Sequence, residues 1–196
     1  MIKPFLKRSI APETHTTEAK LAYNDKTESI TLVAAIDQAL AIGREGKLLW
    51  PRRLQADMDH FVSLTMGHTV AMGRKTYESI SRKYRPLEGR DNWILTRDST
   101  YSQPGCRIFH DVDEVLRAYL GRDLFIAGGG EVYRLFLPHA TRLVITHVDT
   151  RVEDADTFFP ELPTSNWSQR VLFRHNRDER NDFPFSVVEY TQIDEF

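Results

Sequence analysis

One stretch decides the fold: Phe125-Ile126-Ala127-Gly128-Gly129-Gly130-Glu131-Val132-Tyr133. A short apolar run leads into three glycines, and a helical pattern then continues until Pro138 stops it. A strand that enters a helix through glycines leaves bare backbone N–H groups at the helix N-terminus, where the helix dipole favours an anion. Two interpretations stay open here: close approach of a phosphate-bearing cofactor, or a tight turn packed against its neighbours. The stretch lacks the full G-x-G-x-x-G of a dinucleotide fingerprint, so the rest of the chain must decide.

The composition limits the class of protein. With 196 residues, 41% of them hydrophobic, the chain suits one globular domain with a sizeable core. The net charge of −2 excludes a strong basic field, so we expect no nucleic-acid partner and no membrane partner. The single Cys106 excludes an internal disulfide and a cysteine-based zinc site, and the histidines show no metal spacing, so we expect no metal. One cysteine also fits the reducing cytoplasm.

The N-terminal segment, residues 1–29, differs from the rest because it has no apolar period. Basic residues without acids in its first part also allow an organellar targeting segment, but no amphipathic helix is evident. We predict a disordered N-terminal extension over 1–29 and one domain over 30–196.

Apolar strands alternate with helical patterns along the domain. This alternation predicts an α/β single domain with a mostly parallel central sheet, flanking helices and an antiparallel C-terminal edge. We expect a loop at Gly43–Lys47, and Trp50 after it is, judged alone, more typical of a core plug than of a ligand contact. The expected strands are 30–36, 68–73, 92–95, 106–109, 124–127 and 142–148, with 169–175 and 185–193 as the antiparallel pair.

The helix expected over Leu54–Met66 carries two acids with different orientations. At about 100° per residue, one stripe collects Leu54, Met58, Phe61, Val62 and Thr65. Asp57 falls on the edge of this stripe and Asp59 on the opposite, polar face. An inward carboxylate is costly unless it is paired. A salt-bridged acid is the plain alternative, but an Asp beside a Phe suits a small planar ligand better.

Polar and basic residues follow the ends of several predicted strands. Arg74, Lys75 and Thr76 follow one, Thr96 and Arg97 follow another, and the glycines follow a third. Open α/β sheets bind ligands at the carboxyl ends of their strands. This shared placement favours the cofactor interpretation over solvated surface charges.

These residues together resemble the dihydrofolate reductase family from about Ile30 to the C-terminus. The motifs that carry the resemblance are Ala41-Ile42-Gly43 with Trp50, Asp57-x-x-x-Phe61, Val70-Ala71-Met72-Gly73-Arg74-Lys75-Thr76-Tyr77-Glu78-Ser79-Ile80, and Gly128-Gly129-Gly130-Glu131-Val132-Tyr133. Ile145-Thr146-His147 and Asp156-Thr157-Phe158-Phe159-Pro160 add to it. An Asp at position 57 resembles the bacterial type, and the family often has a cis bond between its first two glycines.

The resemblance implies NADPH-dependent reduction of 7,8-dihydrofolate to tetrahydrofolate by a cytoplasmic monomer. It implies that Asp57 holds the pterin, supported by Thr146, that Arg90 takes the carboxylate of the glutamate tail, and that Ala35, Ile42 and Tyr133 flank the nicotinamide. The implied catalytic residues are Asp57, Trp50 and Thr146, and the implied substrate contacts are Val33, Ala34, Met58, Phe61, Ile80, Leu87 and Arg90. The implied cofactor contacts are Ala35, Ile42, Gly43, Gly73, Arg74, Lys75, Thr76, Leu95, Thr96, Arg97, Ala127, Gly128, Gly129, Gly130, Glu131, Val132 and Tyr133.

The chain departs from the family pattern mainly in one loop. Leu49 stands where the family usually has Pro, two extra residues lie around Pro51–Arg53, and three more lie around Arg82–Arg85. A reductase of the same fold that acts on a pyrimidine of the riboflavin pathway is the closest alternative. A catalytically weak relative kept for binding is a second, and the intact Asp57 and glycines argue against it.

Overall fold

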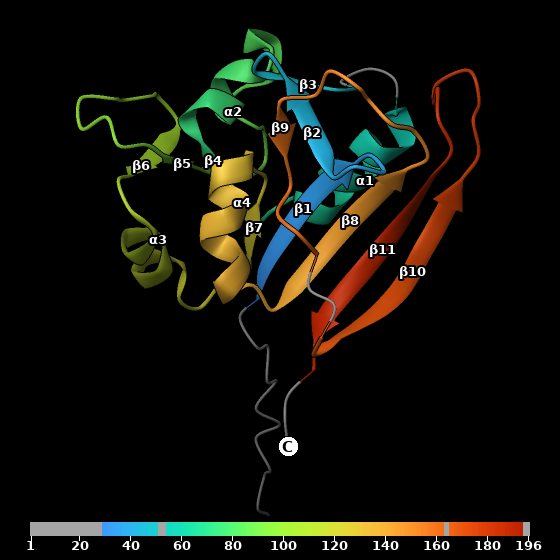
Figure 1. Ribbon diagram of the computed structural model, residues 1–196. Helices are drawn as coiled ribbons and strands as arrows, with labels where there is room; N and C mark the ends of the chain where they lie inside the picture. Colours follow the sequence, from blue (N-terminus) through green and yellow to red (C-terminus); the bar gives the residue numbers. More distant parts are fainter. Residues whose placement is uncertain (1–28, 51–53, 163–164, 194–196) are drawn as a thin grey trace, which may run out of the picture.

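An eight-stranded sheet forms the centre of the computed structural model, which describes residues 29–50, 54–162 and 165–193. Its strands are β1 Ile30–Ile36, β4 Thr69–Gly73, β5 Asp91–Leu95, β6 Cys106–Phe109, β7 Leu124–Ile126, β8 Arg142–Val148, β10 Trp167–His175 and β11 Phe185–Gln192. Their order across the sheet is β10-β11-β8-β1-β7-β4-β5-β6 (Figure 1). All neighbours from β8 to β6 are parallel, whereas β11 is antiparallel to both β8 and β10. The predicted fold class, including the antiparallel C-terminal edge, is therefore confirmed.

Helices cover both faces of the sheet. They are α1 Gln55–Thr65, α2 Arg74–Ser79, α3 Val112–Tyr119 and α4 Gly130–Phe136, with the 3-10 turns η1 Arg82–Tyr84 and η2 Leu137–His139. Figure 1 shows α4 in front of the sheet and α1 behind β1 and β8. In the segments that the structure describes, no helix has the length and apolar character needed to cross a membrane.

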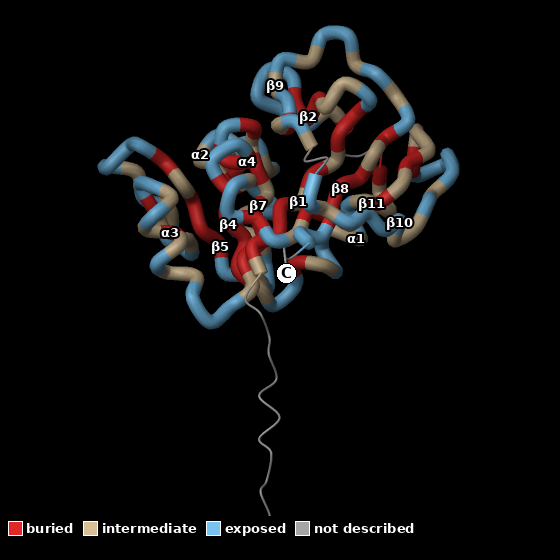
Figure 2. The backbone as a smooth tube through the Cα atoms, turned by 60° about the horizontal axis from the view of Figure 1, so that its bottom comes forward, coloured by how far each residue is buried: buried red, intermediate tan, exposed pale blue. Residues whose placement is uncertain are grey.

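The side chains of β1 divide between the two faces because successive residues of a strand point to opposite sides. Leu32, Ala34 and Ile36 pack into the cluster that contains Val132 and other side chains of α4. Val33 and Ala35 pack against the clusters on the α1 side. Figure 2 shows the buried residues gathered along these central strands. The sheet thus carries one core on each face, and the face toward α1 is the one relevant to Asp57.

The loop expected at Gly43–Lys47 is wrong in part. Strands β2 Ala41–Arg44 and β3 Lys47–Leu48 form a hairpin, and β9 Thr157–Phe158 pairs with β2 to complete a second, three-stranded sheet. The turn between β2 and β3 has φ of 50° at Glu45 and 71° at Gly46, which suits the right-handed twist of a two-residue hairpin. A strand this short gives no period to detect, and its partner β9 lies more than a hundred residues later.

Two acids of the segment before β9 hold this hairpin. Asp154 forms an ion pair of 2.5 Å with Arg44, and Asp156 accepts a hydrogen bond of 2.7 Å from the backbone N–H of Glu45. No group of three or more His, Cys, Asp or Glu side chains in the described ranges could hold a metal ion. Asp154 and Asp156 therefore stabilise the small sheet.

Candidate active site

The carboxylate of Asp57 lies in the first turn of α1 and meets β8. The hydroxyl of Thr146 donates a hydrogen bond of 2.5 Å to Oδ1 of Asp57. Burial raises the pKa of Asp57 to about 6, and the hydrogen bond from Thr146 acts in the opposite direction. The inward orientation predicted for Asp57 from the helical period is confirmed. The result is a carboxylate that is mainly ionised at neutral pH yet close to the range in which it takes up a proton.

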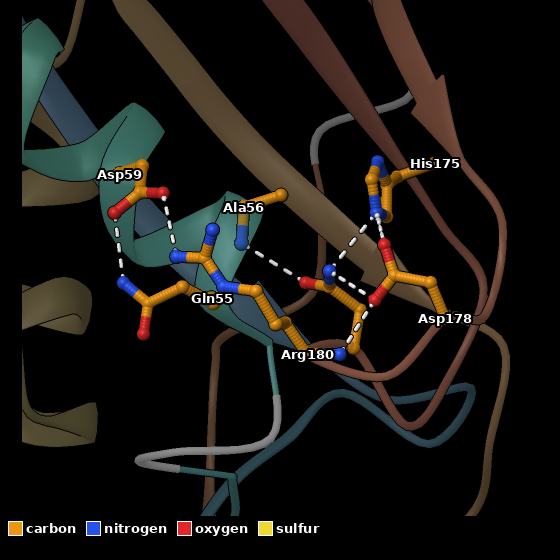
Figure 3. Close-up of polar contacts among 7 residues, drawn as sticks. Gln55, Ala56, Asp59, His175, Asp178 and Arg180 are labelled. Atoms are coloured by element: carbon orange, nitrogen blue, oxygen red, sulfur yellow. Dashed lines mark hydrogen bonds and ion pairs between the residues drawn. The ribbon is translucent and has the colours of Figure 1, made fainter.

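Asp59 lies on the outer face of the same helix, as predicted. Its side chain is 61% exposed and sits 3.6 Å from the guanidinium of Arg180, while the amide of Gln55 donates to it at 2.7 Å (Figure 3). Asp57 and Asp59 are two positions apart on the helix, so they point about 200° away from each other. The phase inferred for this helix is therefore right for its two acids.

The apolar stripe expected on α1 is wrong at two positions. Leu54 and Thr65 are buried, but Met58 and Val62 each keep 36% of their surface exposed. The buried face is turned toward the C-terminal hairpin, where the ring of His60 packs edge-on against Phe173 with centroids 5.1 Å apart. Helical periodicity cannot reveal this neighbour, because the hairpin lies more than a hundred residues downstream.

Phe61 and several predicted substrate contacts share the α1 side of the sheet. Phe61, Ile80, Leu87 and Val33 pack against one core cluster there. Ala34 does not join them, because its side chain packs into the cluster on the α4 side. The side chain of Ala34 is thus separated from α1 by the sheet.

Arg90 is the most informative of the predicted substrate contacts. Its Nε and Nη1 atoms are buried and have no hydrogen-bond partner in the part of the chain that the structure describes. Burial lowers the pKa of its guanidinium, and Glu88 only partly offsets this. A buried guanidinium without an acceptor is costly, so the geometry invites an anionic ligand.

Asn92 holds this arginine in place and was missed in the sequence analysis. Asn92 is 2% exposed, and its side-chain amide donates to the carbonyl groups of Leu87 and Arg90, both at 2.9 Å. Its Oδ1 accepts from the backbone N–H of Leu87 at 2.8 Å. An amide residue next to the start of a buried strand is the signal that could have revealed this role.

Trp50 is 7% exposed and packs in the core cluster of Leu54, in T-shaped contact with Phe183 at 6.5 Å between ring centroids. This position matches the core plug inferred for the residue alone. The extra residues predicted at Pro51–Arg53 lie outside the described residues. The extra residues predicted around Arg82–Arg85 include η1, whose side chains are exposed.

The glycine stretch lies against β4 and α4. The backbone N–H of Gly73 donates to the carbonyl of Gly128 at 2.7 Å, and the peptide bond between Gly128 and Gly129 is cis, as the resemblance allowed. Gly128 has φ of +100°, and a Cβ there would meet the Tyr133 ring at 2.9 Å. A Cβ at Gly130 would lie 2.7 Å from the carbonyl oxygen of Phe158. Contacts within the protein therefore require these glycines, in line with the tight-turn interpretation, and leave room for a ligand role beside it.

Tyr133 connects the glycine stretch to Asp57. Its hydroxyl donates a hydrogen bond of 2.6 Å to the carbonyl of Val33. Burial and then the negative charge of Asp57 raise the pKa of Tyr133. The α4 helix thus reaches the neighbourhood of the carboxylate.

The basic residues gather where β4 and β5 end. Gly73 and Leu95 are register partners, so Arg74 and Thr96 follow the two strands side by side. Arg74 lies 3.8 Å from Glu78 and over the ring of Tyr101, whereas exposed Arg97 has no ion pair within the described ranges. Thr96 is 8% exposed, and its hydroxyl already accepts from the backbone N–H of Asp98. The predicted clustering of Arg74 and Thr96 at the carboxyl ends of neighbouring strands is confirmed.

The remaining predicted cofactor contacts lie around this edge. Ile42 and Val132 are buried in the α4-side core, and Ala35 is the register partner of Thr146. Glu131 is exposed and paired with Arg134. Lys75 is exposed, and Gly43 pairs within the small sheet. A Cβ at Gly129 would lie 3.1 Å from the hydroxyl of Thr76, and the backbone N–H of Ala127 donates to the carbonyl of Ala71.

Comparison with known proteins decides what this arrangement belongs to. The family model described as dihydrofolate reductase matches residues 29–192. The chain belongs to the dihydrofolate reductase family. It is 34% identical to dihydrofolate reductase type 3 of Salmonella typhimurium over 160 residues, which is 81% of this chain and 95% of that protein. It is 41% identical to the dihydrofolate reductase of Mycobacterium tuberculosis strain H37Rv over 123 residues, which is 62% of this chain and 73% of that protein.

A solved dihydrofolate reductase has the same fold. The Enterococcus faecalis enzyme, complexed with NADP(H) and RAB-propyl, superposes with a TM-score of 0.77 at 30% identity, covering 85% of this chain and 97% of that one. The family, the fold and the enzyme class expected from the sequence are thereby confirmed, and the site of a dihydrofolate reductase is to be sought around Asp57.

Proposed function

We propose that this chain reduces 7,8-dihydrofolate to 5,6,7,8-tetrahydrofolate with NADPH. The observation that carries the proposal is the Asp57–Thr146 pair together with Arg90, whose buried Nε and Nη1 atoms have no acceptor among the described residues. A pterin offers N–H groups to a carboxylate, and its glutamate tail offers a carboxylate to an arginine. Family membership supports the same substrate.

Asp57 orients and polarises the substrate in this proposal. Thr146 donates to Oδ1, and no described residue donates to Oδ2, so acceptor capacity is left for the pterin amino and ring N–H groups. The negative charge favours protonation of the substrate nitrogen next to the carbon that is reduced. Phe61, Ile80 and Leu87 supply an apolar wall that limits water on this side.

The residues at the strand ends suit a cofactor that carries phosphates. Arg74, Lys75 and Arg97 supply basic side chains after the ends of β4 and β5. Among the described residues, Arg74 has one ion-pair partner, Glu78. The solved Enterococcus faecalis relative was complexed with NADP(H), which supports the same cofactor here. NADPH supplies the hydride when it is bound. Arg74 and Arg97 would hold its 2′-phosphate end, and Ala35, Ile42 and Tyr133 would position its nicotinamide.

The direct test is turnover of the purified protein. NADPH and dihydrofolate are mixed with the enzyme, and loss of NADPH absorbance is followed against a no-enzyme control and against Asp57→Asn. We expect oxidation that depends on dihydrofolate. No oxidation above the control would remove the proposal, and oxidation with a riboflavin-pathway pyrimidine in place of dihydrofolate would favour the alternative reductase.

We also propose that the enzyme acts as a monomer in the cytoplasm, without a nucleic-acid partner. The net charge of −2 argues against nucleic-acid binding, and the single cysteine fits the cytoplasm. Sedimentation of the purified protein tests the oligomeric state, and a gel-shift assay with DNA and RNA tests nucleic-acid binding. Residues 1–29 form a dispensable extension in this proposal, and residues 30–196 form the catalytic domain.

A further inference from the structure

Helix α1, which carries Asp57, begins without a cap of its own. The first N–H groups of any α-helix lack partners inside the helix, and a polar side chain at the N-cap normally supplies one. The N-cap here is Leu54, which is 3% exposed and makes no side-chain capping hydrogen bond. The start of α1 therefore needs partners from elsewhere.

The loop between β10 and β11 supplies these partners. Oδ1 of Asn181 accepts a hydrogen bond of 2.9 Å from the backbone N–H of Ala56, and the carbonyl of Arg180 accepts one of 3.2 Å from the backbone N–H of Gln55. Asn181 is only 3% exposed, and it also forms an isolated β-bridge with Leu54. A residue 125 positions away thus performs the task of the missing cap for α1.

The amide of Asn181 is held in this orientation by its own loop. Its Nδ2 donates to Oδ1 of Asp178 at 2.8 Å, and the backbone N–H of Asp178 donates to the carbonyl of Asn181 at 2.9 Å. Hydrogen bonds from Asn181, then from the backbone of Arg180 and from His175, lower the pKa of Asp178 to about 2. Because the amide nitrogen is committed to Asp178, the amide oxygen faces Ala56.

The paired strands β8 and β11 connect the two groups that hold the carboxylate and the backbone near Asp57. Strand β11, which follows the Asn181 loop, pairs with β8 so that Val187 lies opposite Thr146. Thr146 holds the carboxylate of Asp57, and Asn181 holds the N–H of the residue just before Asp57. A shift at the start of α1 would therefore change the distance from Asp57 to Thr146.

We propose that Asn181 is a positioning residue for the reaction: by capping the first turn of α1, it keeps the Asp57 carboxylate in hydrogen-bond contact with Thr146. Asn181 bonds to the backbone of Ala56, the residue before Asp57, and therefore acts through the helix backbone. This inference rests on the proposed role of Asp57 in the reduction of dihydrofolate.

The first experiment titrates Asp57 by carboxyl NMR in the full chain and in Asn181→Ala, which requires no turnover. We expect the pKa of Asp57 to rise in Asn181→Ala, because the hydrogen bond from Thr146 that lowers it is weakened. Tyr133, the titratable group on α4 that responds to Asp57, has a raised pKa and stays neutral in this range, so it adds no charge to the shift. An unchanged or lowered pKa overturns the inference.

A double-mutant comparison separates positioning from general loosening. In the Thr146→Val background, Asn181→Ala should add no further rise in the pKa of Asp57, because the contact through which Asn181 acts is already gone. A further rise of the same size would show that Asn181 acts by another route and would overturn the inference.

Turnover gives the second readout, with a matched control in the same loop. Asn181→Ala should lower kcat roughly 10- to 100-fold, the scale of a small misplacement of a catalytic group, with NADPH affinity unchanged. Arg180→Ala should leave kcat and the pKa unchanged, because it removes only the exposed ion pair with Asp59. Equal losses in both variants would contradict the inference.

Asp178→Ala serves where Asn181→Ala does not fold. It removes the carboxylate that orients the Asn181 amide, and it should raise the pKa of Asp57 in the same direction by a smaller amount. No change in that pKa would overturn the inference. Failure of the unmodified protein to oxidise NADPH with dihydrofolate would instead refute the proposed function, and the titration would still report on Asn181.

Discussion

The hydroxyl of Thr146 donates a hydrogen bond of 2.5 Å to the carboxylate of Asp57, which lies 89 positions earlier in the chain. One partner is on the first turn of α1 and the other is on β8, so this contact joins a helix to the centre of the sheet. Burial raises the pKa of Asp57 to about 6 despite this hydrogen bond. The first two predictions depend on this carboxylate and its raised pKa.

Asp57→Asn should slow hydride transfer by about 10²–10⁴-fold at neutral pH, the range for losing general acid–base assistance. The rate should recover in acid, where solvent protonates the substrate directly. Single-turnover kinetics across pH measure this. Asp59→Asn is the control, and it should be nearly silent because Asp59 faces solvent. If Asp59→Asn slows hydride transfer strongly and Asp57→Asn slows it little, Asp57 is not the acid of the active site.

Asp57→Asn should also stabilise the folded protein at neutral pH. The folded pKa of about 6 lies above the ordinary 3.8, so protonation favours the folded state and stability falls as pH rises between these values. Above the folded pKa the cost of the buried charge is fully present, up to about 3 kcal/mol at 1.36 kcal/mol per pKa unit. Urea unfolding of both proteins measures this. The gain should vanish below pH 3.8, and an equal gain at every pH would contradict the argument.

Arg90→Lys should weaken dihydrofolate binding by about 1–3 kcal/mol, the range for a charged hydrogen bond. The buried Nε and Nη1 atoms have no acceptor within the described residues, and a lysine cannot reproduce two parallel hydrogen bonds to a carboxylate. Calorimetry with dihydrofolate measures the loss. A pterin without the glutamate tail should bind equally to both proteins, and an equal loss with that ligand would make Arg90 structural.

Replacing Arg74 and Arg97 together by Ala should raise the KM for NADPH far more than the KM for NADH. The extra negative charge of the 2′-phosphate suits charge-assisted contacts from arginine. Exposed Arg97 has no ion pair in the described part of the chain, and Arg74 is held at 3.8 Å from Glu78. Steady-state kinetics with both cofactors measure the difference. Equal effects on the two would remove this assignment, and Lys75→Ala alone serves as a comparison at the same strand end.

A chain that starts at Glu28 should keep both its folding and its turnover. The family match begins at residue 29, and the side chain of Ser29 donates a hydrogen bond of 2.8 Å to Asp123, so Ser29 is retained. Thermal melting and activity of the shortened chain measure the outcome. A large fall in melting temperature would show that residues 1–27 dock on the domain.

The sequence by itself determined the strands of the large sheet, the helices and the identity of the key acid. These features are periodic or local: the apolar runs of a parallel sheet, the 3.6-residue helical repeat that separates Asp57 from Asp59, and the strand–glycine–helix stretch. Each is encoded within about a dozen residues, so it can be recognised without knowledge of the tertiary structure.

Only the tertiary structure decided which distant residues hold the site together. Thr146 was assigned to Asp57 through resemblance, but two contacts between distant segments had no sequence signal: Asn181 at Ala56, and β9 beside β2. The same reason explains the error at Met58 and Val62, whose exposure depends on how the C-terminal hairpin packs on α1. Periodicity reports which face of an element is apolar, whereas the partner of that face depends on contacts between segments as many as 125 positions apart.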